Sequence, residues 1–104
     1  MKDVEWLAQW YADQCDGEWE HDYGVHIETL DNPGWRLRID LAATPLASRT
    51  FTPERFESDA WVRFWCESNV FHAAGGPMSL PVMIGRFRQW ATENDSTLQE
   101  PPRS

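Results

Sequence analysis

Two stretches of alternating apolar and polar residues constrain the fold more than any other feature of this sequence. In the first, Val25, Ile27 and Thr29 alternate with polar residues, and a second run follows Asn32-Pro33-Gly34. The apolar positions of that second run are Trp35, Leu37, Ile39 and Leu41. A period of two is typical of strands with one buried face, and two such strands joined by a turn form a hairpin. Residues 24–41 are therefore predicted to form an antiparallel hairpin.

The sequence predicts whether the number of residues in the loop of this hairpin is odd or even. Both apolar sets share one face only if the number of loop residues is odd. The cross-strand pairs expected on this basis are Ile27 with Ile39, Glu28 with Arg38, and His26 with Asp40. A three-residue loop with Gly34 in the left-handed conformation satisfies the condition, and so does a five-residue loop.

A second hairpin is predicted around the turn Ser68-Asn69, with strands at residues 61–67 and 70–73. The first of these strands places Val62, Phe64 and Cys66 on one face and Trp61, Arg63, Trp65 and Glu67 on the other. Aromatic residues therefore lie on both faces, so the sheet carries large apolar groups on each side.

Two helices are predicted, one near each end of the sequence. The apolar stripe of the first consists of Trp6, Leu7, Trp10 and Tyr11. Asp16-Gly17 ends this helix. The second follows Gly75-Gly76-Pro77, where we expect a positive φ, and Ser79 is its expected N-cap with Pro81 in the first turn. Its stripe is Leu80, Met83, Ile84, Phe87, Trp90 and Ala91.

Three segments have weaker patterns. Residues 18–23 show no clear period and are predicted to form a connection or a short strand. Residues 42–58 are predicted to form an edge strand or an irregular crossing, anchored by Phe51 and Phe56. Residues 93–104 contain few apolar groups and are predicted to be a disordered tail.

Together these elements predict an α+β fold, in which an antiparallel sheet of four or five strands is flanked by an N-terminal and a C-terminal helix. We expect one domain at residues 1–92, because 104 residues are too few for a second hydrophobic core. The first residues lack the basic and apolar regions of a signal peptide, and no run of about 18 apolar residues occurs. A cytoplasmic protein is therefore expected.

Acidic residues are concentrated in the first third of the chain. Residues 1–31 contain nine acidic residues and one lysine, which accounts for the whole net charge of −8. The eight arginines and eight acidic residues of residues 32–104 cancel. An anionic lobe repels nucleic acid and anionic lipid and attracts basic partners, so we expect neither a nucleic-acid ligand nor a membrane.

Two candidate partner-binding surfaces follow from these patterns. The first is acidic with one aromatic anchor, and consists of Asp16, Glu18, Trp19, Glu20 and Asp22. The second combines indole and guanidinium groups on one sheet face, and consists of Arg36, Arg38, Trp61, Arg63 and Trp65. Tryptophan and arginine are the residues enriched at the energetic centres of protein interfaces. A covering helix over the second surface is the alternative.

Catalytic and metal-binding chemistry has one candidate cluster, which consists of Glu20, His21, Asp22 and His26. A small metal- or ligand-binding module or an enzyme built on this cluster is the alternative function. The spacing of the two histidines defines no ligand geometry, so no metal and no cofactor are expected. Cys15 and Cys66 show no metal-ligand spacing and are expected to be free thiols.

Several short motifs occur in the order found in a known family. They are Glu5-Trp6-Leu7, Trp10-Tyr11, Cys15, Trp19-Glu20-His21, Tyr23-Gly24, the run from Ile27 to Trp35 that contains Pro33-Gly34-Trp35, and Gly75-Gly76-Pro77 before a helix that ends at Trp90. With these motifs the chain resembles the immunity protein 53 family over about residues 4–91. The sequence departs from the family pattern in residues 42–58 and in the proline-rich tail.

The resemblance implies a non-catalytic antidote from a bacterial polymorphic toxin system, encoded beside its toxin. Such a protein binds a cognate toxin tightly in the cytoplasm and covers or distorts its active site. A toxin that acts on nucleic acid, such as a nuclease, presents a basic cleft, which an anionic lobe can enter as a mimic of the phosphate backbone. The resemblance does not indicate whether the free protein is a monomer or a homodimer.

Overall fold

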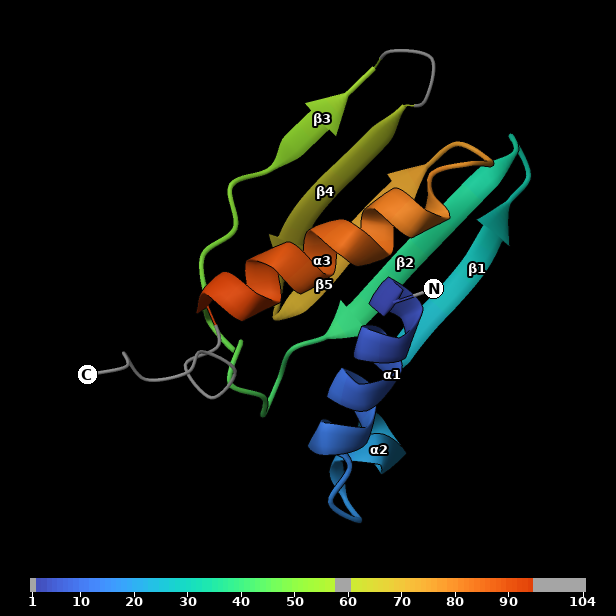
Figure 1. The fold of residues 1–104 in the computed structure, drawn as a ribbon. Coiled ribbons are helices and arrows are strands. Elements are labelled where there is room, and N and C mark those ends of the chain that lie inside the picture. Colours follow the sequence, from blue (N-terminus) through green and yellow to red (C-terminus); the bar gives the residue numbers. More distant parts are fainter. Residues whose placement is uncertain (1, 58–60, 95–104) are drawn as a thin grey trace.

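The computed structural model describes residues 2–57 and 61–94, which form a five-stranded antiparallel sheet and two long helices (Figure 1). In chain order the elements are α1 (Lys2–Gln14), α2 (Trp19–Asp22), β1 (Val25–Leu30), β2 (Gly34–Asp40), β3 (Glu54–Phe56), β4 (Val62–Glu67), β5 (Val70–Gly75) and α3 (Leu80–Asn94). The α+β fold with a helix before and after the sheet is therefore confirmed. None of these helices is long and apolar enough to cross a membrane.

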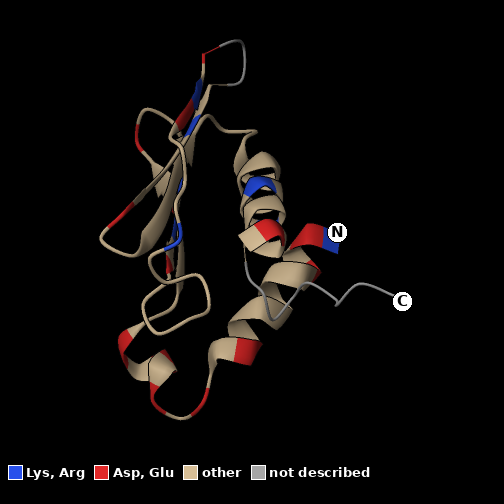
Figure 2. Cartoon of the chain, turned by 90° about the vertical axis from the view of Figure 1, so that its left-hand side faces the viewer, with Lys and Arg blue, Asp and Glu red and all other residues tan. Residues whose placement is uncertain are grey.

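The strand order is β1-β2-β5-β4-β3, so β1 and β3 are the edges of the sheet. Both long helices lie on the same face, as the side view in Figure 2 shows. No element within residues 2–57 and 61–94 covers the opposite face. The molecule thus has one closed, two-layered side and one open sheet face.

The core lies between the helices and the two central strands. Its fully buried members include Leu37 and Ile39 from β2, Phe71 from β5, and Met83 and Phe87 from α3. The predicted stripe of α3 is confirmed, because all of its members except the half-buried Leu80 are buried. Several aromatic pairs of this core meet edge to face, and such pairs add to the stabilisation from buried area.

The β1–β2 hairpin has the predicted parity and a different register. A three-residue loop, residues 31–33, joins Leu30 to Gly34, and Ile27 lies opposite Leu37 instead of Ile39. The predicted polar partners still meet, but diagonally: Arg38 reaches Glu28 at 3.3 Å and His26 reaches Asp40 at 3.6 Å. Such diagonal neighbours on one sheet face are within reach of long side chains.

The register is shifted because Gly34 belongs to β2 and not to the loop. Its backbone passes so close to β5 that a methyl group at this position would collide with the carbonyl oxygen of Gly75. Glycine is therefore needed here for space, and Gly34 has no positive φ. The same holds for Gly75, whose added Cβ would lie 2.8 Å from Ser79 Cβ and 2.9 Å from the carbonyl oxygen of Trp61. The positive φ expected at Gly75-Gly76 is therefore wrong.

The β4–β5 hairpin is confirmed. Ser68 and Asn69 are both left-handed, with φ of 54° and 60°, as a two-residue hairpin turn of type I′ requires. Ser79 directly precedes α3, and its carbonyl accepts the N–H of Met83, as expected of an N-cap residue. Its hydroxyl, however, donates to the carbonyl of Trp61 at 3.1 Å instead of capping the helix.

Three weakly patterned segments are now defined in part. Residues 19–22 form the short helix α2, where we expected a connection or a strand. Within residues 42–58, β3 is the predicted edge strand and Phe51 is the predicted anchor, but Phe56 is 51% exposed. Helix α3 continues to Asn94, and the rest of the predicted tail, residues 95–104, lies outside the described residues.

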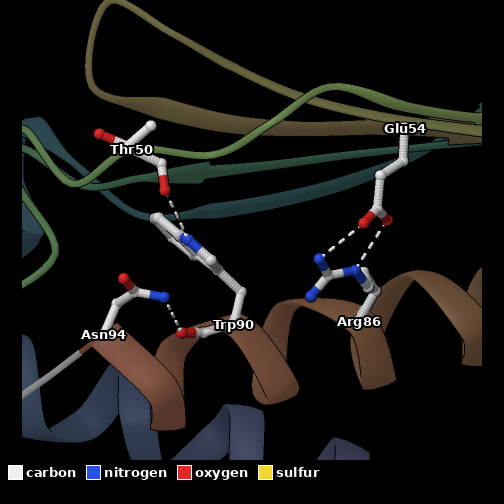
Figure 3. Close-up of polar contacts among 5 residues, drawn as sticks. All are labelled: Thr50, Glu54, Arg86, Trp90 and Asn94. Atoms are coloured by element: carbon white, nitrogen blue, oxygen red, sulfur yellow. Dashed lines mark hydrogen bonds and ion pairs between the residues drawn. The ribbon is translucent and has the colours of Figure 1, made fainter.

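Helix α3 holds the crossing segment against the sheet (Figure 3). The indole Nε1 of Trp90 donates to the carbonyl of Thr50 at 3.0 Å, and the guanidinium of Arg86 donates twice to the carboxylate of Glu54. These bonds hold the crossing segment, which leads into β3, against α3. They explain how this segment is ordered although it contains two prolines.

The two ends of the described chain are joined. Arg88 of α3 donates to Asp3 of α1 at 2.9 Å, and the rings of Trp6 and Phe87 lie 5.9 Å apart. Gly85 faces this junction, because a Cβ there would lie 3.0 Å from the Asp3 carboxylate. Helix α1 thus packs on α3 and closes the helical layer.

Candidate partner-binding surfaces

The acidic surface lies at one end of the molecule, where α1 turns into α2 (Figure 2). Asp16 and Glu20 hold the backbone of this turn together. Asp16 Oδ1 accepts the N–H groups of Glu18 and Trp19 at 3.0 and 2.9 Å, and the Glu20 carboxylate accepts those of Asp16 and Gly17 at 3.0 and 2.9 Å. The two bonds donated to Asp16 lower the pKa of its carboxyl below the ordinary value. Asp16 and Glu20 therefore shape the turn, and the lowered pKa of Asp16 favours its charged form.

Trp19 does not lie on this surface. Its side chain is 5% exposed, packs edge to face on Trp10, and donates its indole N–H to the carbonyl of Ala42 at 2.9 Å. The expectation of an exposed aromatic anchor is therefore wrong: α2 is a helical turn, and it directs this ring into the core. The exposed aromatic rings at this end belong to Tyr11 and Tyr23, which flank Trp19 on either side.

The second surface lies on the open face of the sheet. Arg36, Arg38, Arg63 and Trp65 belong to β2 and β4, and their side chains are on the face that the helices leave uncovered. Trp65 stacks on His72 of β5, with ring centroids 5.0 Å apart and an angle of 6° between the planes. Trp61 precedes β4, and Arg63 lies over its ring at 5.6 Å. No covering helix is found over this face among the described residues.

Three arginines of the open face lie within ion-pair distance of carboxylates. Arg38 pairs with Glu28, and Arg55 and Arg63 reach Glu57 at 3.2 and 4.0 Å. The open face is therefore a mixed surface with aromatic groups at its centre, and it lacks a strong positive field.

Residues 2–57 and 61–94 contain no arrangement of three or more His, Cys, Asp or Glu side chains that could hold a metal ion. The two cysteines are free and half-buried. Burial raises the pKa of the Cys66 thiol to about 11, so it is protonated near neutral pH and a weak nucleophile. Cys15 directly follows α1, and its thiol donates to the carbonyl of Tyr11 in that helix at 3.3 Å.

A groove that the sequence patterns did not reveal lies beside α1. It has a volume of about 310 Å³, and its lining residues are Val4, Leu7, Ala8, Tyr11, Gly24 and Val25. Val4, Ala8 and Tyr11 form a second stripe on α1, at the spacing of one helix face, and all three are exposed. The placement of Tyr11 in the buried stripe of this helix is therefore wrong, since only Leu7 and Trp10 of α1 are buried. The signal was present in the sequence, but the stronger stripe through Leu7 and Trp10 obscured it.

The sequence matches the family Immunity protein 53 over residues 4–92. No curated protein and no solved structure matches the chain. The matched residues run from the first turn of α1 to the last turn of α3, so the match spans the three helices and five strands of the described residues. The chain therefore belongs to the immunity protein 53 family.

Proposed function

We propose that this protein neutralises a cognate bacterial toxin by forming a stoichiometric complex with it in the cytoplasm, without catalysing any reaction. Membership of the immunity protein 53 family carries this proposal. A concentration of acidic residues at the end where α1 turns into α2 supports a binding role (Figure 2). We propose that the toxin belongs to a polymorphic toxin system.

The acidic end is the surface we propose for the first encounter with the toxin. Glu18 and Asp22 are exposed there, and Asp16 and Glu20 add charge from the turn beneath. Like charges gathered on one end produce a field that attracts a basic partner before contact and increases the association rate. A toxin that acts on nucleic acid offers the basic cleft that such a surface fits.

The direct test uses the toxin domain encoded beside this chain's gene. Purified wild-type protein is expected to abolish the toxin's activity at a one-to-one ratio and to co-elute with it. Residual activity in the presence of excess protein, with no complex detected, would contradict the proposed function.

The surface is tested by reversing charge at two exposed positions. The double variant Glu18→Lys and Asp22→Lys is expected to slow association and to flatten its dependence on salt. The matched control is Glu57→Lys with Glu67→Lys, which changes the net charge equally but at the open sheet face. If the control slows association and the acidic-end variant does not, the encounter surface is the open face with its Trp65–His72 stack.

A further inference from the structure

The edge of β1 is the long unprotected edge of the sheet. The other edge strand, β3, has three residues, and ion pairs of Glu54 with Arg86 and of Arg55 with Glu57 flank it. By contrast β1 has six residues, contains no proline or lysine, and is not covered by any described segment. Its polar side chains Glu28 and His26 pair with Arg38 and Asp40 of the neighbouring strand β2, on the open face of the sheet. Short strands and charged side chains are what natural proteins use to block edge pairing, so β1 stands open to another strand.

The hydrogen-bond pattern shows which backbone groups of β1 are free to pair. Asp40 donates its backbone N–H to the carbonyl of Gly24 at 3.1 Å. This bond shows which residue pairs of the β1–β2 ladder are hydrogen-bonded and which are not. Bonded pairs alternate along an antiparallel ladder, so the N–H and C=O groups of Val25, Ile27 and Thr29 point away from β2. Three residues of β1 thus present donors and acceptors along the outer edge.

The groove beside α1 lies next to this edge. Val25 belongs to both, because it lines the groove and turns its backbone outward. On the helix side of the sheet, Val4 and Ile27 are 44% and 46% exposed. An extended segment paired with β1 would place alternate side chains over this apolar groove, as in strand addition to other sheet edges.

The negative charge around the β1 edge favours the binding of a basic partner segment. The groove and the edge are built from α1 and β1, which lie in the third of the chain that carries the entire net charge of −8. Exposed Asp22 and Asp31 stand at the two ends of β1. A basic segment is attracted to this edge, whereas a second copy of the chain would bring a second anionic edge against it.

We propose that the β1 edge and the α1–β1 groove bind an extended segment of the toxin, with apolar residues at alternate positions and basic residues at its ends, by strand addition. This inference rests on the proposed function and specifies the contact through which the complex forms. The acidic turn at α2 directs the partner, and the edge strand then holds it.

The first experiment measures amide hydrogen exchange by NMR on ¹⁵N-labelled full-length protein, alone and with the adjacent toxin domain. The amides of Val25, Ile27 and Thr29 are expected to exchange rapidly in the free protein and about tenfold or more slowly in the complex. Complex formation without protection of these amides would overturn the inference and leave the proposed function standing. Absence of any complex would overturn both.

The second experiment fills the groove while keeping the charge change matched. Ala8→Arg places a long side chain in the groove, and Ala12→Arg adds the same charge one turn later on α1, outside the lining residues. Ala8→Arg is expected to raise the Kd for the toxin about tenfold relative to Ala12→Arg. Equal affinities of the two variants would contradict the inference, and so would a free protein that is a dimer with these amides already protected.

Discussion

Glu54 of β3 and Arg86 of α3 form a two-pronged ion pair, in which Nε and Nη2 of the guanidinium each donate to one carboxylate oxygen at 2.8 Å. The side chains of Glu54 and Arg86 are only 29% and 23% exposed, so water screens this pair less than an exposed one. Arg86 also lies over the ring of Phe51 at 5.0 Å. The pair thus connects the shortest strand, the crossing segment and the C-terminal helix.

We predict that Glu54→Gln lowers the free energy of unfolding by about 1–3 kcal/mol at neutral pH, because a charge-assisted double hydrogen bond is lost. Hydrogen bonding to Arg86 lowers the pKa of Glu54. Its contribution is therefore fully present above the ordinary carboxyl pKa and is lost as the pH falls through the lowered value. Urea unfolding of both proteins at several pH values should show their difference shrinking in acid. Glu57→Gln, in an exposed pair, is the control and should cost less than about 1 kcal/mol.

Trp19 is predicted to stabilise the fold and not to contact the toxin directly. Trp19→Ala should cost about 3–5 kcal/mol, because it empties a buried site and leaves the carbonyl of Ala42 without its donor. Thermal unfolding measures this loss. Tyr23→Ala removes a neighbouring exposed ring and should cost much less. Equal costs for the two variants would contradict the buried position of Trp19.

Substitution of Gly34 by a residue with a side chain is predicted to lower the stability of the protein. Gly34→Ala should destabilise the protein by about 1–3 kcal/mol or more, because its methyl group meets the backbone of Gly75 and the strands must separate locally. Gly24→Ala is the matched control, since nothing lies within 4 Å of a Cβ there. Denaturant unfolding of the two variants should therefore separate them clearly, and similar stabilities would contradict the close packing of β2 on β5.

The imidazole of His72 is predicted to have a pKa below its ordinary value in the folded protein. Burial, together with the charge of Arg36, lowers the pKa of this imidazole. The unfolded chain therefore binds the proton first on acidification, and this contribution to stability falls as the pH drops below the ordinary histidine value. Trp65→Ala removes the stacked ring, so the pKa of His72 should rise, which an NMR titration detects. The same variant should cost about 1–3 kcal/mol, less than Trp19→Ala.

The sheet was predictable where residue patterns are local. Alternation around Ser68-Asn69 was sufficient for the β4–β5 hairpin, because two residues with left-handed conformations fix the turn and the pairing together. The odd number of loop residues was sufficient to predict which side chains of β1 and β2 share a face, but it was not sufficient to predict the register of the two strands. That register depends on the close approach of Gly34 to Gly75, which are 41 positions apart and show no common pattern in the sequence.

The candidate surfaces were predictable in part, for a related reason. Charge is a property of composition, so the acidic end could be located from the sequence alone. The orientation of Trp19 depends on a four-residue helix, too short to show a helical period. The groove beside α1 requires the position of Val25 relative to Val4 and Ala8, which only the assembled sheet defines.

The junction of α1 with α3 has a consequence for how the protein is made. Arg88 and Asp3 are 85 positions apart, so the side of α1 that packs on α3 is covered only after α3 has been synthesised. The two hairpins can form as they emerge, but the complete core requires the C-terminal helix. The native packing of residues 2–57 and 61–94 can therefore be completed only after α3 has been synthesised.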